Sequence, residues 1–377
     1  MQRRGGGAGG REGLGGRTIV TLADVARVAG VHYSTVSRAL DPDTARQVNL
    51  ETRQRVQALA KRMGYHKDMV ASGLKQGRTH TVAVIAGDLG NPNLPPVLRG
   101  IAGGLEQGGL MTLISETRFD SARLERILNH LMSRRVDAII MTAARPRDAP
   151  TLRWIRRQGI PLVLAIQTVP GIRLPACTND DYLGGVLAAR HLLSLGHRRF
   201  AQLRGPMEFS SCFLRAQGFS QTVAAARAEE VVVRSTALWA SPELGGALMR
   251  ELLDKKGVRP TGIFAHHDLT AFGALTAAEE RGLTCPRDLS IVGYHNLPHN
   301  DRIAPPLTSI GQPREELGRT AAEILIAVLT KPGPTPAPRL VRPFLVVRKS
   351  TGPPPKAYQS PVSRPRSLQT IVEDPAD

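Results

Sequence analysis

The sequence predicts an α/β protein preceded by a small helical domain, and three observations lead to this prediction. Residues 21–40, TLADVARVAGVHYSTVSRAL, have the pattern of two short helices joined at a glycine, which is the helix-turn-helix pattern. From Thr81 onward, short apolar strands alternate with amphipathic helices, which predicts parallel sheets with right-handed crossovers. The strands are too many for one compact sheet, so we expect two lobes with a cleft between them. The expected strands cover residues 82–86, 110–114, 138–141, 161–166, 200–203, 231–233, 262–265 and 290–293.

Composition limits the class of protein. The chain has 377 residues and a formal net charge of +18, which favours an anionic partner such as nucleic acid, a membrane surface or an acidic ligand. Cys177, Cys212 and Cys285 lie far apart without a CxxC pair, which argues against a disulfide scaffold and a structural zinc site and suits a reducing cytosol. No apolar run approaches the roughly 20 residues that span a membrane, and the N-terminus lacks the apolar stretch of a secretory signal.

The two ends of the chain have compositions that predict disorder. Residues 1–17 are rich in Gly and Arg and cannot bury enough surface to fold. The window 5–10 matches GxGxxG, but no strand precedes it and no helix follows, so we do not interpret it as a dinucleotide site. Residues 351–377 are rich in Pro, Ser and charge, and they show no heptad of apolar residues that would predict a C-terminal coiled coil.

The first two helices are predicted from their caps and apolar faces. Thr21 and Asp24 have the spacing of a capping box, and Gly30 supplies the tight turn. The apolar stripe of the first helix comprises Leu22, Val25, Ala26 and Val28. The second helix is expected to bury Val36 and Leu40. Its outward side chains have the size and polarity to reach base edges and phosphates in a major groove, and they are Tyr33, Ser34, Ser37 and Arg38. An ordinary helical hairpin with a polar face is the alternative.

A third helix is expected after the loop at 41–47, in which Pro42 ends the second helix. Asn49 is its predicted N-cap. Its apolar residues Leu50, Val56 and Leu59 are expected to close a small core with the first two helices. Basic residues line its outer side, either as a solvated face or as contacts to phosphates, which add affinity without sequence information. They are Arg53, Arg55, Lys61 and Arg62.

These three helices, continuing to Gly64–Tyr65, resemble the DNA-binding headpiece of the LacI/GalR family of bacterial transcription regulators. The resemblance covers nearly the whole chain after the first seventeen residues. It implies a headpiece at 18–65, a hinge helix at 66–78, and a two-lobed effector-binding and dimerisation domain at 79–350, similar to type I periplasmic binding proteins. The lobes are expected at about 80–177 with 309–337 and at about 178–308 with 338–350.

The resemblance also implies which residues contact DNA. In the headpiece they are Thr21, Tyr33, Ser34, Thr35, Ser37, Arg38 and Arg53; in the hinge they are Val70, Ala71 and Leu74. Leu74 matches the leucine that wedges between base steps in the minor groove. Lys67 stands where the family usually has proline, and Gly73 costs about 1 kcal/mol relative to alanine inside a helix, so we expect a marginally stable hinge.

An effector is expected beyond the carboxyl ends of the strands, where open parallel sheets bind ligands. The expected contacts there are Asn91, Gln167, His267, Asp268, His295 and Asn296, and the family turns Arg215 and Trp239 toward the same cleft. Packing in the core is the alternative for Trp239, and an ion pair with a nearby acid is the alternative for Arg215. The family usually has Asn-Asp at 267–268 and Asp-Asp or Asn-Asp at 295–296. Histidine can donate or carry positive charge, so we hypothesise an anionic effector, a sugar acid or another organic acid.

No catalytic constellation, cofactor site or metal site is predicted. His266 and His267 are adjacent on an expected strand and would point to opposite faces. A Rossmann-type enzyme needs a glycine fingerprint after its first strand, and residues 82–91 lack one. A solute-binding receptor would need a signal peptide and would not carry the headpiece. We therefore expect a cytoplasmic, nucleoid-associated homodimer that represses transcription from a pseudo-palindromic operator under the control of a small effector, with no membrane contact.

Overall fold

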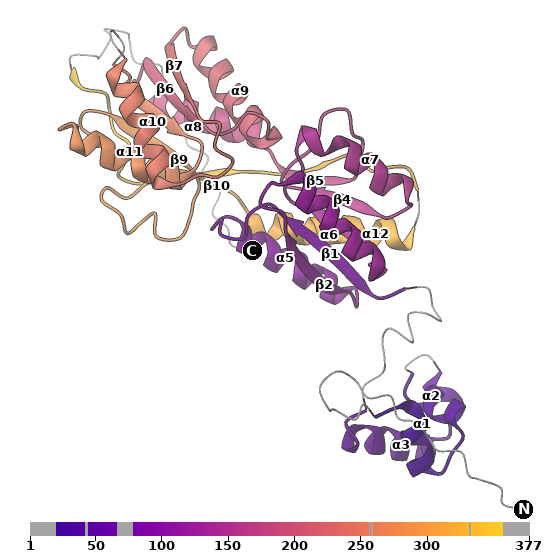
Figure 1. Cartoon of the computed structure of the whole chain (residues 1–377). Coiled ribbons are helices and arrows are strands. Elements are labelled where there is room, and N and C mark those ends of the chain that lie inside the picture. Colours follow the sequence, from indigo (N-terminus) through magenta and orange to yellow (C-terminus); the bar gives the residue numbers. More distant parts are fainter. Residues whose placement is uncertain are drawn as a thin grey trace, which may run out of the picture. The chain divides into compact units, whose positions relative to one another are not determined.

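The computed structural model describes residues 20–41, 44–65, 78–255, 257, 259–331 and 333–356. The chain divides into two compact units, one ending at Thr79 and one beginning at His80. Figure 1 labels their helices and strands. The predictions for the arm at 1–17, the hinge at 66–77 and the tail at 357–377 lie outside the described residues.

The first unit is a three-helix domain, as predicted. It contains the helices α1 (Leu22–Ala29), α2 (Tyr33–Ala39) and α3 (Leu50–Arg62), with a 3-10 turn η1 (Ala45–Gln47) before α3. Val25, Val36 and Val56 are fully buried and form the centre of its core. The predicted core places of Val28 and Leu50 are wrong, because these side chains are 54% and 57% exposed.

Helical geometry explains both errors. The buried residues of α1, Val25, Ala26 and Ala29, occupy an arc of about 100°, and Val28 lies about 60° outside this arc. Leu50 precedes Val56 by six residues, which again turns it away from the buried face by about 240°.

Local hydrogen bonds set the boundaries of these helices. The Thr21 amide donates to the Asp24 carboxylate at 3.0 Å, and the Asp24 amide donates to the Thr21 hydroxyl, which confirms the capping box. Gly30 ends α1 with φ 64°, a conformation that favours glycine. The Asn49 side-chain oxygen accepts from the Thr52 amide at 2.8 Å and caps α3, as predicted.

The second unit contains two six-stranded sheets, each with helices on both faces (Figure 1). The first lobe has a fully parallel sheet with the order β11-β5-β4-β3-β1-β2. Its strands are β1 (Thr81–Ala86), β2 (Met111–Glu116), β3 (Ala138–Met141), β4 (Leu162–Ala165), β5 (Ala176–Asn179) and β11 (Arg339–Val341). One face is covered by α5 (Leu94–Gln107) and α12 (Arg314–Thr330), the other by α6 (Ser121–Ser133) and α7 (Ala149–Arg157), with the turn η2 (Pro146–Asp148) before α7.

The second lobe has the sheet order β12-β10-β9-β8-β6-β7, with only the edge strand β12 antiparallel among the described strands. Its strands are β6 (Arg199–Arg204), β7 (Glu229–Arg234), β8 (Gly262–Ala265), β9 (Ser290–His295), β10 (Thr308–Gly311) and β12 (Phe344–Val346). One face is covered by α8 (Asp181–Ser194) and α9 (Ser210–Ala225), the other by α10 (Pro242–Asp254) and α11 (Asp268–Glu280). The predicted two-lobed α/β architecture is therefore confirmed.

The crossovers between the lobes differ from their predicted positions by a few residues. Strand β10 pairs with β9, so the chain returns to the first lobe after Gly311 rather than at 309. Strand β11 pairs with β5, so the last crossover follows Val341 rather than residue 337. Both strands are short, and each is assigned to its lobe by pairing, β10 with β9 and β12, and β11 with the distant strand β5.

The start of the predicted disordered tail is ordered, which corrects its boundary. The carbonyl of Gly352 accepts from the His197 ring at 2.9 Å, and the Thr351 hydroxyl bonds the His191 ring at 2.9 Å. Pro354 is buried. These contacts hold residues 351–354 against the second lobe because the backbone there finds polar partners that composition does not reveal. Within the described part of the chain, no helix has the length and apolar character needed to cross a membrane.

Candidate functional site

The predicted DNA-reading side chains of the first unit lie on and around α2. Tyr33 is 51% exposed, and Ser37 and Arg38 are also exposed, whereas Ser34 and Thr35 are half-buried. Thr21 is exposed, with its hydroxyl engaged at the N-terminus of α1. Val70, Ala71 and Leu74 lie outside the described residues.

His32 caps α2, and the sequence analysis missed it. Its Nδ1 accepts from the Ser34 amide at 3.3 Å and lies 2.8 Å from the Ser34 hydroxyl. The His32 ring also meets the Tyr33 ring edge-on, with 5.4 Å between their centroids. Histidine is not among the residues favoured at N-caps, so sequence gave little signal for this role. The contact orients the first turn of α2, where Tyr33 and Ser34 lie.

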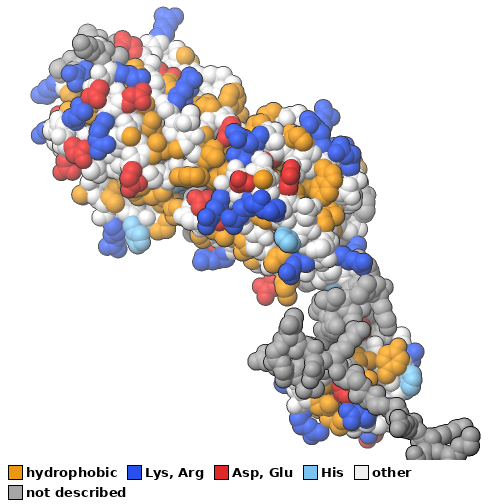
Figure 2. Space-filling view, viewed as in Figure 1, with side chains coloured by type: hydrophobic (Ala, Val, Ile, Leu, Met, Phe, Trp, Pro, Cys, Tyr) orange, Lys and Arg blue, Asp and Glu red, His pale blue; other side chains and the backbone are white. Residues whose placement is uncertain are grey.

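The basic residues of α3 present their charges to solvent. Arg55, Lys61 and Arg62 are exposed and Arg53 is half-buried. Elsewhere, Figure 2 shows Lys and Arg side chains interspersed with Asp and Glu over the visible face of the second unit. A surface with both positive and negative side chains is typical of a soluble protein, so positive charge alone does not indicate DNA binding. The basic residues of α3 are candidates for phosphate contact because they belong to the same small domain as the helix-turn-helix.

A pocket of about 140 Å³ lies between the two lobes of the second unit, at the carboxyl ends of strands from both sheets. Six of the eight predicted effector contacts line it: Asn91, Gln167, Arg215, Trp239, His267 and His295. Asp268 and Asn296 are not among its lining residues. Trp239 is 56% exposed, so packing in the core does not describe it.

Asp268 supports the pocket from behind instead of lining it. It is fully buried, and its carboxylate accepts from the Leu297 amide at 2.7 Å, from Asn300 at 2.9 Å and from the Ser309 hydroxyl at 2.7 Å. Burial raises its pKa to about 6. Asn296 accepts from Arg348 at 2.8 Å. The predicted ligand contacts of Asp268 and Asn296 are therefore corrected, because their side chains point to neighbouring loops and strands.

Arg215 forms a buried ion pair, the alternative that the sequence left open. Its guanidinium lies 2.8 Å from the Asp181 carboxylate, and its central carbon lies 3.4 Å from the centroid of the Tyr294 ring. The Tyr294 hydroxyl donates to the same carboxylate at 2.7 Å. Asp181 thus compensates the positive charge that was expected to attract an acid.

His267 and His295 lie side by side but are neutral. Their ring centroids are 4.3 Å apart, and burial lowers the pKa of His267 to about 3 and that of His295 well below its usual value. Of the two properties that the sequence suggested for these histidines, donating a hydrogen bond or carrying positive charge, the second is wrong. Since the Nδ1 of His267 accepts from the Leu269 amide at 3.1 Å, its proton is on Nε2. His267 therefore offers a donor.

Several buried polar atoms of pocket-lining residues have no partner among the described residues. Three are donors: Arg204 Nε, Arg215 Nε and His267 Nε2, and His295 Nδ1 is also without a partner. Three are acceptors: His266 Nδ1, Asn179 Oδ1 and Gln312 Oε1. His266 is an acceptor at Nδ1 because its Nε2 donates to the Gln202 side-chain oxygen at 2.8 Å. Buried polar groups normally have partners, so the pocket is suited to a ligand that both donates and accepts hydrogen bonds.

Contacts across the pocket join the lobes. The Gln167 amide nitrogen donates to the Ser211 hydroxyl at 2.8 Å, and its oxygen accepts from the Ser210 hydroxyl at 3.1 Å. The Phe119 ring of the first lobe meets the Phe209 ring of the second edge-on at 5.4 Å. Sequence reasoning missed both phenylalanines, because nothing in their local pattern marks them as facing residues.

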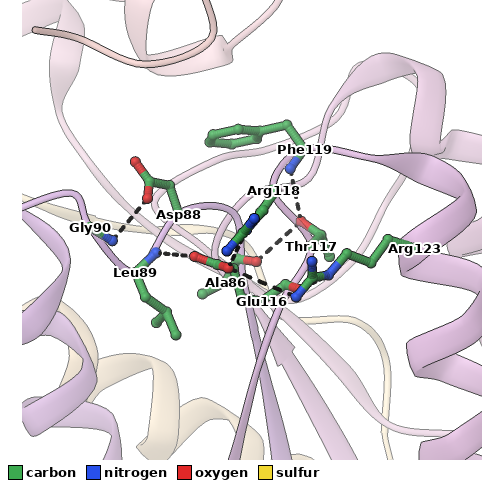
Figure 3. A network of polar contacts seen from close by, with 9 residues as sticks. All are labelled: Ala86, Asp88, Leu89, Gly90, Glu116, Thr117, Arg118, Phe119 and Arg123. Atoms are coloured by element: carbon green, nitrogen blue, oxygen red, sulfur yellow. Dashed lines mark hydrogen bonds and ion pairs between the residues drawn. The ribbon is translucent and has the colours of Figure 1, made fainter.

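The turn that carries Phe119 is held by a polar network around Glu116 (Figure 3). The Glu116 carboxylate accepts from the Leu89 amide at 2.9 Å and from Arg118 at 3.0 Å, and these bonds lower its pKa. Arg123 donates to the Glu116 carbonyl at 2.7 Å. In Figure 3 the Phe119 ring extends away from this network, above Asp88. No group of three or more His, Cys, Asp or Glu side chains suited to a metal occurs in the residues that the structure describes.

Comparison with known proteins agrees with both units. Residues 21–68 match the family described as bacterial regulatory proteins, lacI family, and residues 189–351 match the periplasmic binding protein-like domain. The HTH-type transcriptional repressor CytR of Escherichia coli strain K12 is 31% identical over 339 residues, which cover 89% of this chain and 97% of that protein.

Two solved structures are also similar. One is the lac repressor dimer bound to operator and the anti-inducer ONPF, with a TM-score of 0.80 and 26% identity over 89% of this chain and 99% of that chain. The other is the complex of the transcriptional regulator CelR with cellobiose, with a TM-score of 0.67 and 28% identity over 88% of this chain and 99% of that chain. With a helix-turn-helix headpiece, a two-lobed binding domain and relatives that are regulators rather than enzymes, the chain belongs to the LacI family of DNA-binding bacterial transcription regulators.

Proposed function

We propose that this protein is a repressor whose affinity for operator DNA is set by a small molecule bound between the lobes of its second unit. The observation that carries the proposal is that one chain combines an exposed polar α2 face with a pocket whose lining has unpartnered donors and acceptors. The 31% sequence identity between this chain and the repressor CytR is spread over 339 residues, which include both units. The effector controls DNA binding only if it has different affinities for the two states of the protein.

The protein acts as a homodimer on a pseudo-palindromic operator. The similar lac repressor structure is a dimer on its operator, and a two-fold protein places two recognition helices on two half-sites. A bacterial DNA-binding regulator works in the cytoplasm, and its target places it at the nucleoid. Within each half-site, Tyr33, Ser34, Thr35, Ser37 and Arg38 read the major groove, while Arg53 contacts phosphate.

The effector is a small hydroxylated metabolite. Each hydroxyl group both donates and accepts, so it can meet the acceptors His266 and Asn179 as well as the donor His267. A simple organic acid at neutral pH only accepts and would leave the acceptors unpaired. A sugar acid retains hydroxyl groups and satisfies the same pattern. Trp239, exposed at the pocket, offers a flat apolar face to a sugar ring.

Two substitutions in the headpiece test DNA reading. We expect Ser34→Ala to change the preferred half-site in a selection from random DNA, because Ser34 lies in the first turn of α2. Arg53→Ala should weaken all sequences by a similar factor and reduce the dependence of binding on salt, because phosphate contacts are independent of sequence. If Ser34→Ala leaves the half-site preference unchanged and Arg53→Ala alters it, the assignment of Ser34 to base reading and of Arg53 to phosphate contact is wrong.

A thermal-shift comparison tests the effector class. We expect at least one neutral sugar or sugar acid to raise the Tm of the full chain and to change its affinity for the selected operator, whereas succinate and acetate leave both unchanged. Trp239→Ala should weaken this binding, and Phe213→Ala is the matched control, because Phe213 is also an exposed aromatic residue but does not line the pocket. Stabilisation by simple organic acids alone would contradict the hydroxylated class.

A further inference from the structure

Arg145 is a buried arginine with unused hydrogen-bonding capacity. Its side chain is 2% exposed, and its Nε and one terminal nitrogen have no hydrogen-bond partner among the described residues. Nε lies 3.5 Å from the Asp148 carboxylate, and the other terminal nitrogen lies 3.4 Å from the Ser121 hydroxyl. Leaving donors of a charged group unpaired in the interior is costly, so this arrangement calls for a functional explanation.

Arg145 lies directly behind the wall of the effector pocket. It lines a second, much smaller cavity of about 10 Å³, which has room for roughly one water. Phe119 and Ala143 line both this cavity and the effector pocket. The guanidinium carbon of Arg145 lies 5.9 Å from the centroid of the Phe119 ring. The Phe119 ring and the Ala143 methyl group therefore lie between the Arg145 guanidinium and the effector pocket.

The Phe119 ring is suited to act as a movable cover. Phe119 is only half-buried, so part of its side chain is open to solvent. Its other contacts are the edge-on contact with Phe209 and close packing over Gly87, where a Cβ would overlap the ring. The backbone beneath it is held in place, because Arg118 and Phe119 both have left-handed φ values, 52° and 56°, stabilised by the Glu116 network (Figure 3). A change of side-chain rotamer can thus uncover Arg145 without moving the turn.

The charged groups around Arg145 favour the binding of an anion over the binding of a cation. Asp148 already engages part of the guanidinium, and its carboxylate also accepts from the Ser121 hydroxyl at 2.9 Å and the Arg145 amide at 3.0 Å. The Asp120 carboxylate accepts from the Arg123 amide at the start of α6. Both carboxylates are therefore engaged by donors, whereas the terminal nitrogen Nη1 of Arg145 has no hydrogen-bond partner among the described residues and can donate a charge-assisted hydrogen bond to a carboxylate or phosphate.

We propose that Arg145 recognises an oxyanion group, carboxylate or phosphate, on the effector, and that Phe119 covers this subsite in the ligand-free protein. The inference rests on the proposed function, since it concerns the same pocket and specifies the class of its effector as a hydroxylated metabolite that carries one anionic group. It assigns the anion selectivity first expected of Arg215, His267 and His295 to Arg145, whose terminal nitrogen Nη1 has no hydrogen-bond partner among the described residues.

Inorganic phosphate is the first probe, measured by its effect on the Tm of the full chain at constant ionic strength with chloride as reference. We expect Phe119→Ala to bind phosphate at least about ten-fold more tightly than the wild type, because the cover is removed and Arg145 remains. The double variant R145Q/D148N removes both charges of the buried pair, and we expect it to lose the phosphate effect. Phosphate bound at the DNA-binding surface is a shared background in all three proteins.

Two results would overturn the proposal. One is a Phe119→Ala variant that binds phosphate no more tightly than the wild type, a comparison that holds even if R145Q/D148N fails to fold. The other is a folded triple variant, carrying Phe119→Ala together with R145Q and D148N, that binds phosphate as tightly as Phe119→Ala alone.

Matched effectors then identify the source of the anion. Glucose, gluconate and glucose 6-phosphate share one carbon skeleton, as do ribose and ribose 5-phosphate. We expect one acid or phosphate to bind the wild type about ten-fold more tightly than its parent sugar, and R145Q/D148N to bind both equally. Equal binding of parent and anion by the wild type contradicts the Arg145 subsite. A neutral sugar that still controls operator binding would leave the proposed function intact, so the two failures are distinguishable.

Discussion

Replacing Arg215 with methionine is expected to lower the free energy of unfolding by about 3–5 kcal/mol, because it leaves the Asp181 carboxylate buried without its partner. Asp181 is 2% exposed and would keep only its bond from the Tyr294 hydroxyl among the contacts described for it here. Urea denaturation of the full chain at pH 7, followed through the transition of the second unit, measures the change. Effector binding should also weaken, since Arg215 lines the pocket.

Two controls separate burial from charge. The double variant R215M/D181N removes both charges and should recover much of the lost stability, because no uncompensated ion remains in the interior. Arg250→Ala breaks the exposed pair with Glu280 and should cost less than about 1 kcal/mol. If Arg215→Met and Arg250→Ala have the same small effect, the Arg215–Asp181 pair does not have the importance that we assign to it.

Gly273→Ala is expected to destabilise the second lobe by about 3 kcal/mol, because α10 and α11 touch at this glycine. A Cβ at Gly273 would overlap the backbone carbonyl oxygen of Pro242. Unlike the end of a flexible side chain, this backbone atom cannot move aside without moving α10. The two helices must separate. Trp239 precedes α10 and His267 caps α11, so the same change should weaken effector binding. Urea denaturation and a ligand titration measure the two effects.

Gly103→Ala is the matched control in another helix. A Cβ at Gly103 meets no described atom within 4 Å, and alanine is favoured over glycine in the interior of a helix such as α5 by about 1 kcal/mol. We therefore expect Gly103→Ala to leave stability unchanged or to increase it. A Gly273→Ala protein as stable as Gly103→Ala would show that α10 and α11 separate easily.

The features that sequence predicted correctly are those made by near neighbours in the chain. The capping box joins Thr21 and Asp24, the α3 cap joins Asn49 and Thr52, and Gly30 ends α1 through its own backbone conformation. Strands β3 and β8 have the predicted bounds, because each is a short apolar run buried along its whole length. Such features depend on interactions over a few residues, which a local pattern records.

The features that sequence missed depend on distant partners. Strands β5, β10, β11 and β12 are only three or four residues long, and their pairing decides whether they exist as strands at all. The disordered tail was predicted to begin at 351 because composition cannot show that Gly352 meets His197.

The pocket shows the same division between local pattern and tertiary structure. Sequence placed Gln167 and His267 near a common site, because the carboxyl ends of parallel strands meet at one edge of a sheet, and the family resemblance placed Trp239 there. The protonation of His267, the pairing of Arg215 with Asp181, and the free donors of Arg145 behind Phe119 were decided only by the tertiary structure. Sequence by itself determined the family, the two-unit organisation and the region of the site. The charge state of each group depended on burial and on partners far along the chain, since desolvation and ion pairing act through space.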